Sequence, residues 1–111
     1  MKVAVIGSRS FDDYKRLKRI LDLYPITVII SGGAAGSDLL GEKYADEKCL
    51  QKEIYYPDWD LFGKSAGFLR NTTIIENCDM VVAMWDGASK GTKDSLDKAN
   101  KLKKTTLIVY F

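Results

Sequence analysis

The stretch Val28–Asp38 reads Val-Ile-Ile-Ser-Gly-Gly-Ala-Ala-Gly-Ser-Asp and predicts how this chain folds. A short run of branched apolar residues, typical of a buried strand, is followed by a turn almost without side chains. Residues with helical spacing come next, and Ser37 or Asp38 can cap that helix. This order of elements builds anion sites in open α/β sheets, because a bare turn admits a phosphate and the helix directs unpaired N–H groups at it.

Two further glycine-rich turns also follow apolar runs. Gly7–Ser10 follows the run Val3–Ile6, and Asp86–Thr92 follows the run Met80–Trp85. The alternation of strands and helices predicts one Rossmann-like α/β domain over residues 1–111, with helices on both faces of the sheet. We expect a five-stranded parallel sheet in the order 3-2-1-4-5, which places all three turns at the crevice between strands one and four.

Periodicity and turn residues set the expected bounds of each element. The strands are predicted at about 2–6, 27–31, 53–56, 79–85 and 106–110. The helices are predicted from Asp12 or Asp13 to about Leu23, from Ser37 or Asp38 to about Cys49, from Ala66 to Glu76, and over 91–103, with 58–65 as a loop. The apolar runs at 3–6, 28–30, 80–85 and 107–110 indicate strands that are buried on both faces.

The composition is that of an ordinary globular protein. Of 111 residues, 46% are hydrophobic and 29% are charged, and the net charge of +2 is too small to suggest a DNA-coating surface. Nucleic acid is therefore not expected as a partner. No apolar run approaches the roughly 20 residues of a membrane span, and Met1 and Lys2 lead directly into a strand without room for a signal peptide. The expected location is the cytoplasm, with no membrane partner.

The chain contains no histidine, and its two cysteines, Cys49 and Cys78, lack the spacing of a metal-binding pair. The commonest general base, the commonest metal ligand and the Ser-His-Asp triad are thereby removed. We expect two buried free thiols, no metal and no cofactor. Any catalysis must use carboxylates, Arg, Lys, Tyr or groups of the ligand.

The three turns supply the candidate ligand-binding residues. None of them matches GxGxxG or a Walker A sequence. The guanidinium of Arg9 can fork onto a phosphate, although a surface Arg beside an ordinary turn is the alternative. Asp38 is a helix cap first and an acceptor for ribose hydroxyls second. The full set of candidates is Gly7, Ser8, Arg9, Gly32, Gly33, Ala34, Gly36, Ser37, Asp38, Trp59, Lys64, Asn71, Gly87, Ser89, Lys90, Gly91 and Thr92.

A polar pair, Arg70 and Asn71, lies within an otherwise apolar predicted helix. Spacing alone leaves two uses open for it, namely ligand binding and an ion pair with Asp58 or Asp60. Trp59 could stack on a base, whereas core packing is the more frequent use of the aromatic residues around it.

Several motifs, taken in order, resemble one known family. They are Gly7-Ser8-Arg9, Ser31-Gly32-Gly33-Ala34-x-Gly36-x-Asp38, Pro57-Asp58-Trp59, Gly63-Lys64-x-Ala66-Gly67-x-x-Arg70-Asn71 and Asp86-Gly87-x-Ser89-x-Gly91-Thr92. The chain is similar to the YspA-type branch of the SLOG superfamily, Rossmann-like domains shared by Smf/DprA proteins and lysine decarboxylase-like LOG proteins. The resemblance implies a bacterial or phage protein that binds nucleotides or nucleotide-derived ligands as a sensor or processing module.

The LOG enzymes are phosphoribohydrolases, which release a base from a nucleoside 5′-monophosphate. Their pattern has an Arg nine positions before the Asp that opens the next strand, a separation that Arg70 and Asp79 keep. Their glycine-threonine pair matches Gly91-Thr92, but Ser95 stands where their catalytic Glu would be. Asp94 is one residue away and so lies about 100° around the helix. Whether the chain is an enzyme stays open on this comparison.

The leading hypothesis is a domain that binds a nucleoside phosphate or an ADP-ribose-like ligand. Its phosphate would contact the amides of 32–37 and 87–92, with Arg9, Lys64 or Lys90 neutralising the charge.

Two alternatives are carried beside it. One is hydrolysis of an N-glycosidic bond, with Asp86, Asp94 or Asp38 as the carboxylate and Arg70 orienting the substrate. The other, DprA-like DNA binding, is the weakest because of the small net charge. A homodimer is compatible with the LOG resemblance.

Overall fold

The apolar run after Met1 forms the central strand of the sheet. The computed structural model describes residues 1–111. Its elements, in chain order, are β1 (Lys2–Gly7), α1 (Tyr14–Leu21), β2 (Val28–Ser31), α2 (Ser37–Glu47), β3 (Gln51–Ile54), α3 (Trp59–Phe62), the 3-10 turn η1 (Gly63–Ser65), α4 (Ala66–Asn77), β4 (Met80–Trp85), α5 (Lys90–Lys101) and β5 (Thr105–Tyr110).

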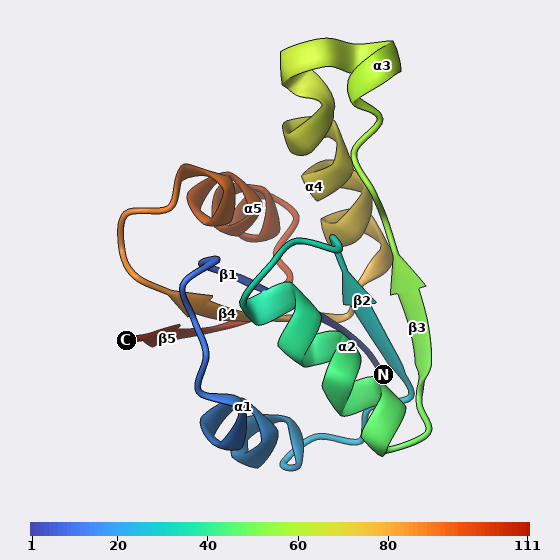
Figure 1. Ribbon diagram of the computed structural model, residues 1–111, viewed down its shortest axis with the longest axis vertical. Coiled ribbons are helices and arrows are strands. Elements are labelled where there is room, and N and C mark those ends of the chain that lie inside the picture. Colours follow the sequence, from blue (N-terminus) through green and yellow to red (C-terminus); the bar gives the residue numbers. More distant parts are fainter.

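All five strands are parallel and stand in the order β3-β2-β1-β4-β5, which confirms the predicted α/β fold. Helices α1 and α2 cover one face and α4 and α5 the other, so the domain has three layers (Figure 1). β1 is the central strand of the sheet: β2 and β3 are added on one side of it, and β4 and β5 are added on the other. This switch of direction leaves a crevice at the carboxyl ends of β1 and β4.

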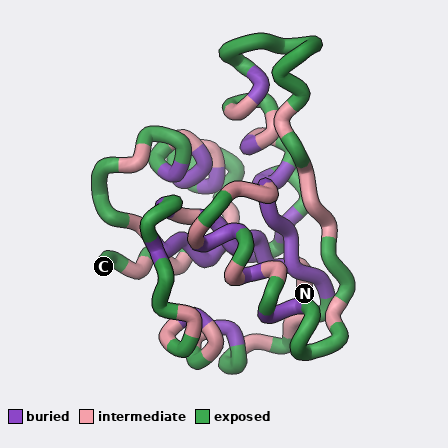
Figure 2. Tube along the Cα trace, in the orientation of Figure 1, coloured by how far each residue is buried: buried purple, intermediate pink, exposed green.

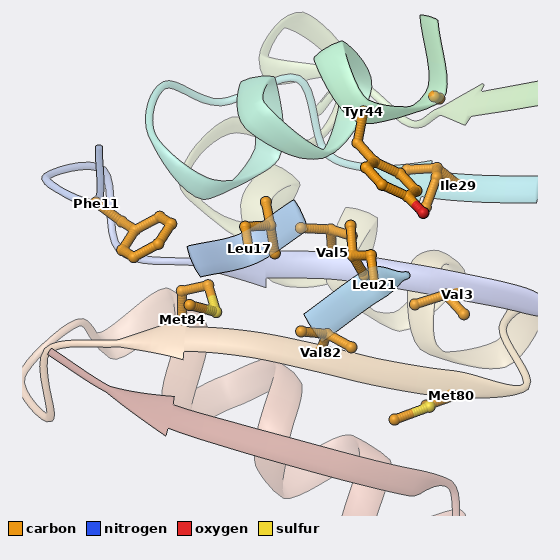
Figure 3. Close-up of a cluster of buried hydrophobic side chains, with 11 residues drawn as sticks. Val3, Val5, Phe11, Leu17, Leu21, Ile29, Tyr44, Met80, Val82 and Met84 are labelled. Carbon is orange, nitrogen blue, oxygen red and sulfur yellow. The ribbon is translucent and has the colours of Figure 1, made fainter. Parts of the chain in front are cut away.

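Alternate residues of β1 serve two hydrophobic cores. Val3 and Val5 face α1 and α2 in the cluster that Figure 3 shows, where Leu17 and Leu21 have no exposed surface. Ala4 and Ile6 face α4 and α5. Each fully buried Val or Leu side chain contributes about 1.5–3 kcal/mol to folding. Burial of both faces explains why this strand is a continuous apolar run.

The two edge strands depart from expectation. β3 ends at Ile54 instead of 56, and β5, predicted to be buried on both faces, exposes 39% of Ile108 and 59% of Tyr110. An edge strand has a neighbour on one side only, so helices cover it incompletely. An apolar run is therefore not by itself evidence that a strand is central.

Local capping accounts for the helix boundaries that differ. The predicted loop 58–65 is helical, because the Asp58 carboxylate accepts the Leu61 N–H at 3.0 Å and caps α3. Helix α2 has Gly36 as its N-cap without a side-chain hydrogen bond, so neither Ser37 nor Asp38 caps it. Helix α3 and η1 extend beyond the sheet at the top of Figure 1, and Figure 2 shows them exposed. None of the helices combines the length and apolarity needed to cross a membrane.

The cysteines have different surroundings. Cys78 is buried as expected, whereas Cys49 is exposed and has a φ of 55°, in the left-handed region. It follows Lys48, the C-cap of α2, where a tight turn leads into the edge strand β3.

Gly41 permits the close contact between α2 and β1. A Cβ atom at this position would lie 2.7 Å from the Cβ of Val5. We expect Gly41→Ala to lower the free energy of unfolding by about 1–3 kcal/mol, because the helix must move off the strand.

Gly67→Ala is the matched control. Gly67 is also helical, yet its nearest neighbour, Cη2 of Trp59, would be at an ordinary 3.5 Å. Helix propensity then favours alanine by up to about 1 kcal/mol. Urea denaturation compares the two variants, and a Gly41→Ala protein as stable as Gly67→Ala would contradict the packing argument.

Candidate functional site

A cleft of about 250 Å³ opens at the carboxyl ends of β1 and β4. All three glycine turns contribute to it, together with α4. Its lining residues are Ile6, Gly7, Arg9, Ala34, Asp38, Arg70, Asn71, Ile74, Ser89, Gly91, Thr92 and Ser95. The structure thus brings eight of the candidate ligand-binding residues, together with Arg70, into one cavity.

Ser8 joins the three turns to one another. Its carbonyl accepts the Ser37 N–H at 3.4 Å and the Ser37 hydroxyl at 3.2 Å. Its amide donates to the Met84 carbonyl at 2.9 Å, and its hydroxyl accepts the Asp86 N–H at 3.0 Å. Ser8 and Ser37 are buried, so these predicted ligand residues hold the loops instead of lining the cleft.

The amides of the second glycine turn are largely used within the protein. The Asp38 carboxylate accepts the N–H of Gly32 at 3.0 Å and of Ala34 at 3.3 Å, and the Ser31 hydroxyl accepts that of Gly33 at 3.1 Å. No hydrogen bond is recorded for the amides of Ala35 and Gly36. The expected anion cradle of amides over 32–37 is therefore reduced to the amides of Ala35 and Gly36.

Gly36 is required for the turns to meet. Its φ of 76° lies in the left-handed region, and an added Cβ would lie 2.5 Å from the carbonyl oxygens of Ser8 and Arg9. The first and second turns can approach this closely only without a side chain at Gly36.

Two guanidinium groups line the cleft. Arg70 donates from Nη1 to the Gly32 carbonyl at 2.6 Å and from Nε to the Asn71 side chain at 3.0 Å, and its Nη2 has no partner. Arg9 is exposed, and neither Arg forms a salt bridge. Burial lowers the pKa of Arg70, the charge of Asp38 raises it, and the charge of Arg9 lowers it by a smaller amount, so the two cations are close enough to repel each other.

Asp38 is the single carboxylate that lines the cleft. Burial raises its pKa to about 6, although hydrogen bonds from Ala34 and Gly32 and the charge of Arg70 act in the opposite direction. The group is therefore partly protonated near neutral pH. With Arg9 and Arg70 beside it, the cleft carries a net positive charge at every protonation state of Asp38.

Asn71 connects the helices on the cleft side of the sheet. Its side-chain amide donates to the Gly91 carbonyl at 3.3 Å and to the Asp94 carboxylate at 3.2 Å, and Asp94 forms a 2.7 Å ion pair with Lys98. Asp94 does not line the cleft, whereas the buried Ser95 does. Ser95, which stands where the LOG resemblance expects a catalytic Glu, thus presents a hydroxyl to the cleft.

The third turn is shaped by its own carboxylate. Asp86 accepts the N–H groups of Ala88 at 2.8 Å and Ser89 at 2.9 Å, which lowers the pKa of its carboxyl. Its side chain is exposed and outside the cleft. Ser89 caps α5, and no hydrogen bond is recorded for the amides of Lys90 and Gly91 at the start of that helix.

The remaining predicted residues lie outside the cleft. Trp59 and Lys64 belong to the exposed α3–η1 segment, and Gly87 and Lys90 are exposed residues of the third turn that do not line the cleft. No Asp58 or Asp60 ion pair with Arg70 forms. The catalytic roles of Arg70, Asp86 and Asp94 stay predictions, with only Arg70 inside the cavity.

Sequence reasoning missed two kinds of contributor. Ile6 and Ile74 form an apolar part of the cleft, and they look like ordinary core residues in the sequence. Tyr56 was assigned to a strand, but its ring lies against Gly33, where an added Cβ would overlap it. Only the position of Tyr56, directly after the end of a strand, could have suggested this contact.

The fold and cleft define the class of protein: a Rossmann-like α/β domain with a positively charged crevice at the topological switch point. The family comparison gives the particular group. The model of the YspA, cpYpsA-related SLOG family matches residues 1–62, more than half of the chain. The chain belongs to this family. It is also 30% identical over 111 residues to the Gene 61 protein of Mycobacterium phage D29, which covers 90% of this chain and 89% of that protein.

Two solved structures share the fold. DNA processing protein A (DprA) from Streptococcus pneumoniae has a TM-score of 0.81 and 21% identity, over 96% of this chain and 49% of that one. DprA from Helicobacter pylori, whose structure describes a single-stranded DNA binding mode, has a TM-score of 0.74 and 24% identity, over 97% of this chain and 64% of that one. The chain therefore spans about half of one DprA protein and under two thirds of the other.

These findings correct one expectation. Nucleic acid was not expected as a partner, yet the structural neighbours are DprA proteins, one of them a single-stranded DNA binder. The net charge misled because it averages the whole surface, whereas two guanidinium groups gather at one cleft. The phage relative fits the expected bacterial or phage origin.

The raised pKa of Asp38 predicts a pH-dependent stability difference. Its folded pKa of about 6 exceeds the reference value of 3.8, so ionisation of Asp38 costs folding stability: this cost builds up as pH rises from about 4 to about 6, is complete above that range and is absent below it. Asn at this position is neutral throughout. The unfolding free energy of Asp38→Asn minus that of the wild type should therefore rise with pH, by at most about 3 kcal/mol.

Urea denaturation at several pH values between about 4 and about 7 measures this difference. A difference that stays flat with pH would show that Asp38 is ionised in the fold without cost.

Proposed function

We propose that residues 1–111 form a single domain that binds the phosphate group of a nucleotide, free or within single-stranded DNA, in the cleft between β1 and β4. The observation that carries this proposal is the pair Arg9 and Arg70, which line one cavity without a carboxylate partner within salt-bridge distance. Two neighbouring cations repel, and a bound phosphate relieves that repulsion.

The hydrogen-bond donors of the cleft fit this anion. Nη2 of Arg70 has no partner in the protein, and Arg9 is free to move onto a ligand. The amide of Gly91, which lines the cleft, lies at the start of helix α5, whose N-terminal dipole favours negative charge. The donors thus come from three segments of the chain: the first turn, helix α4 and the start of helix α5.

The size of the cleft limits what it can enclose. A volume of about 250 Å³ is below the usual 300–1,000 Å³ of pockets that enclose a whole ligand. It suits a phosphate with part of its sugar, so the base of the ligand would lie outside. The Ser95 hydroxyl in the lining is suited to contact a sugar hydroxyl of a free nucleotide.

Arg9→Ala is the sharpest test of phosphate binding, because Arg9 makes no recorded hydrogen bond and its loss should leave the fold intact. Loss of a charge-assisted hydrogen bond should weaken binding by about 1.5–3 kcal/mol. Arg19→Ala removes the same charge from an exposed position on α1 and should change affinity little at moderate salt. Calorimetric titration with AMP, ADP-ribose and oligothymidylate measures these affinities.

The ligands distinguish the two sources of phosphate. Binding of AMP alone would assign free nucleotides, and binding of the oligonucleotide alone would assign DNA. If Arg9→Ala and Arg19→Ala bind every ligand as tightly as the wild type, or if the wild type binds none at millimolar concentration, the proposal is wrong.

A further inference from the structure

A second groove lies next to the phosphate cleft. It has a volume of about 380 Å³ and runs between the segment after β3 and helix α4. Its lining includes Tyr55, Tyr56, Phe62, Leu69 and Arg70. Arg70 lines both cavities, so the groove and the cleft adjoin at this one side chain.

The apolar side chains of this groove are unusually exposed. The exposed fractions are 69% for Tyr56, 49% for Phe62 and 44% for Leu69. Trp59 and Leu61 on α3 are exposed as well, at 57% and 70%. Scattered exposed apolar residues need no explanation, but a contiguous group around a groove marks a binding surface.

The position of Tyr56 ties the groove to the glycine turn. Its ring lies against Gly33, one residue from the Gly32 carbonyl that accepts the Arg70 hydrogen bond. The Tyr56 hydroxyl makes no hydrogen bond within the protein. The guanidinium of Arg70 and the exposed ring of Tyr56 thus both lie against the second glycine turn.

We propose that this groove stacks one base of a single-stranded DNA whose phosphate occupies the cleft. This inference rests on the proposed phosphate binding, and it specifies that the bound phosphate belongs to single-stranded DNA. A strand alternates phosphates and bases, so a phosphate at Arg70 places a neighbouring base beside the same side chain. Aromatic rings and guanidinium planes are the groups on which unpaired bases stack.

The chemistry of the groove predicts tolerance of base identity. The Asp58 carboxylate caps α3, the Tyr55 hydroxyl donates to Glu53, and both threonine hydroxyls of the lining donate to carbonyls of α4, so Arg70 and the Tyr56 hydroxyl are the remaining polar groups. Every base offers a π face, whereas reading a base requires donors and acceptors at fixed positions. The groove should therefore accept all four bases with similar affinity.

The test compares two oligonucleotides with equal numbers of phosphates, oligothymidylate and a fully abasic strand, by fluorescence anisotropy at low salt. The wild type should bind oligothymidylate at least about fivefold more tightly than the abasic strand. Tyr56→Ala should lose this preference while keeping its affinity for the abasic strand. Tyr56→Phe should keep the preference, because stacking needs the ring and not the hydroxyl.

Tyr110→Ala is the matched control, since Tyr110 is 59% exposed and lines neither cavity. It should behave as the wild type. Circular dichroism checks that each variant is folded.

The outcomes separate this inference from the proposed function. Equal binding of both strands by the wild type, or an unchanged preference in Tyr56→Ala, would overturn base stacking while phosphate binding stands. Failure of the wild type to bind either strand would also overturn it, and binding of AMP that depends on Arg9 would still support the phosphate cleft.

Discussion

The hydrogen bonds of Ser8 hold the candidate site together. Its hydroxyl, carbonyl and amide reach the second and third turns, and each of these atoms is buried among main-chain groups. A buried main-chain group without a partner would cost about 1–3 kcal/mol, so each contact also satisfies a requirement of the fold. The arrangement of the cleft is therefore a consequence of closing three turns at one edge of the sheet.

Much of this architecture is predictable from the sequence. Apolar runs followed by glycine turns indicate parallel strands, and the switch point then fixes where the turns meet. What sequence reasoning could not supply is the use of each polar group. Ser8 and Asp38 are small polar residues beside glycines. Residues of this kind can contact a ligand, and they can equally well hydrogen-bond to neighbouring loops of the protein. Only coordinates show that their partners are amides of the protein.

The same ambiguity explains the segment around Asp58. Its residues lack helical periodicity, and a single capping carboxylate decides that they form α3. The expectation drawn from net charge is wrong for a related reason, because a net charge of +2 does not show where on the surface the cationic side chains lie. Arg9 and Arg70 are 61 positions apart in the sequence and meet only because of the sheet order.

Helix α3 and η1 contain no buried residue, in contrast to the interlocked turns beneath them. Segments with little buried surface open locally at low free energy, whereas a hydrogen-bonded junction opens only with the whole domain. Amide hydrogen exchange in this segment should accordingly be fast against slow exchange at the turns. A rigid set of turns beside a mobile helix would let the domain hold one part of a ligand in a fixed position while the α3–η1 segment adjusts to the rest of that ligand.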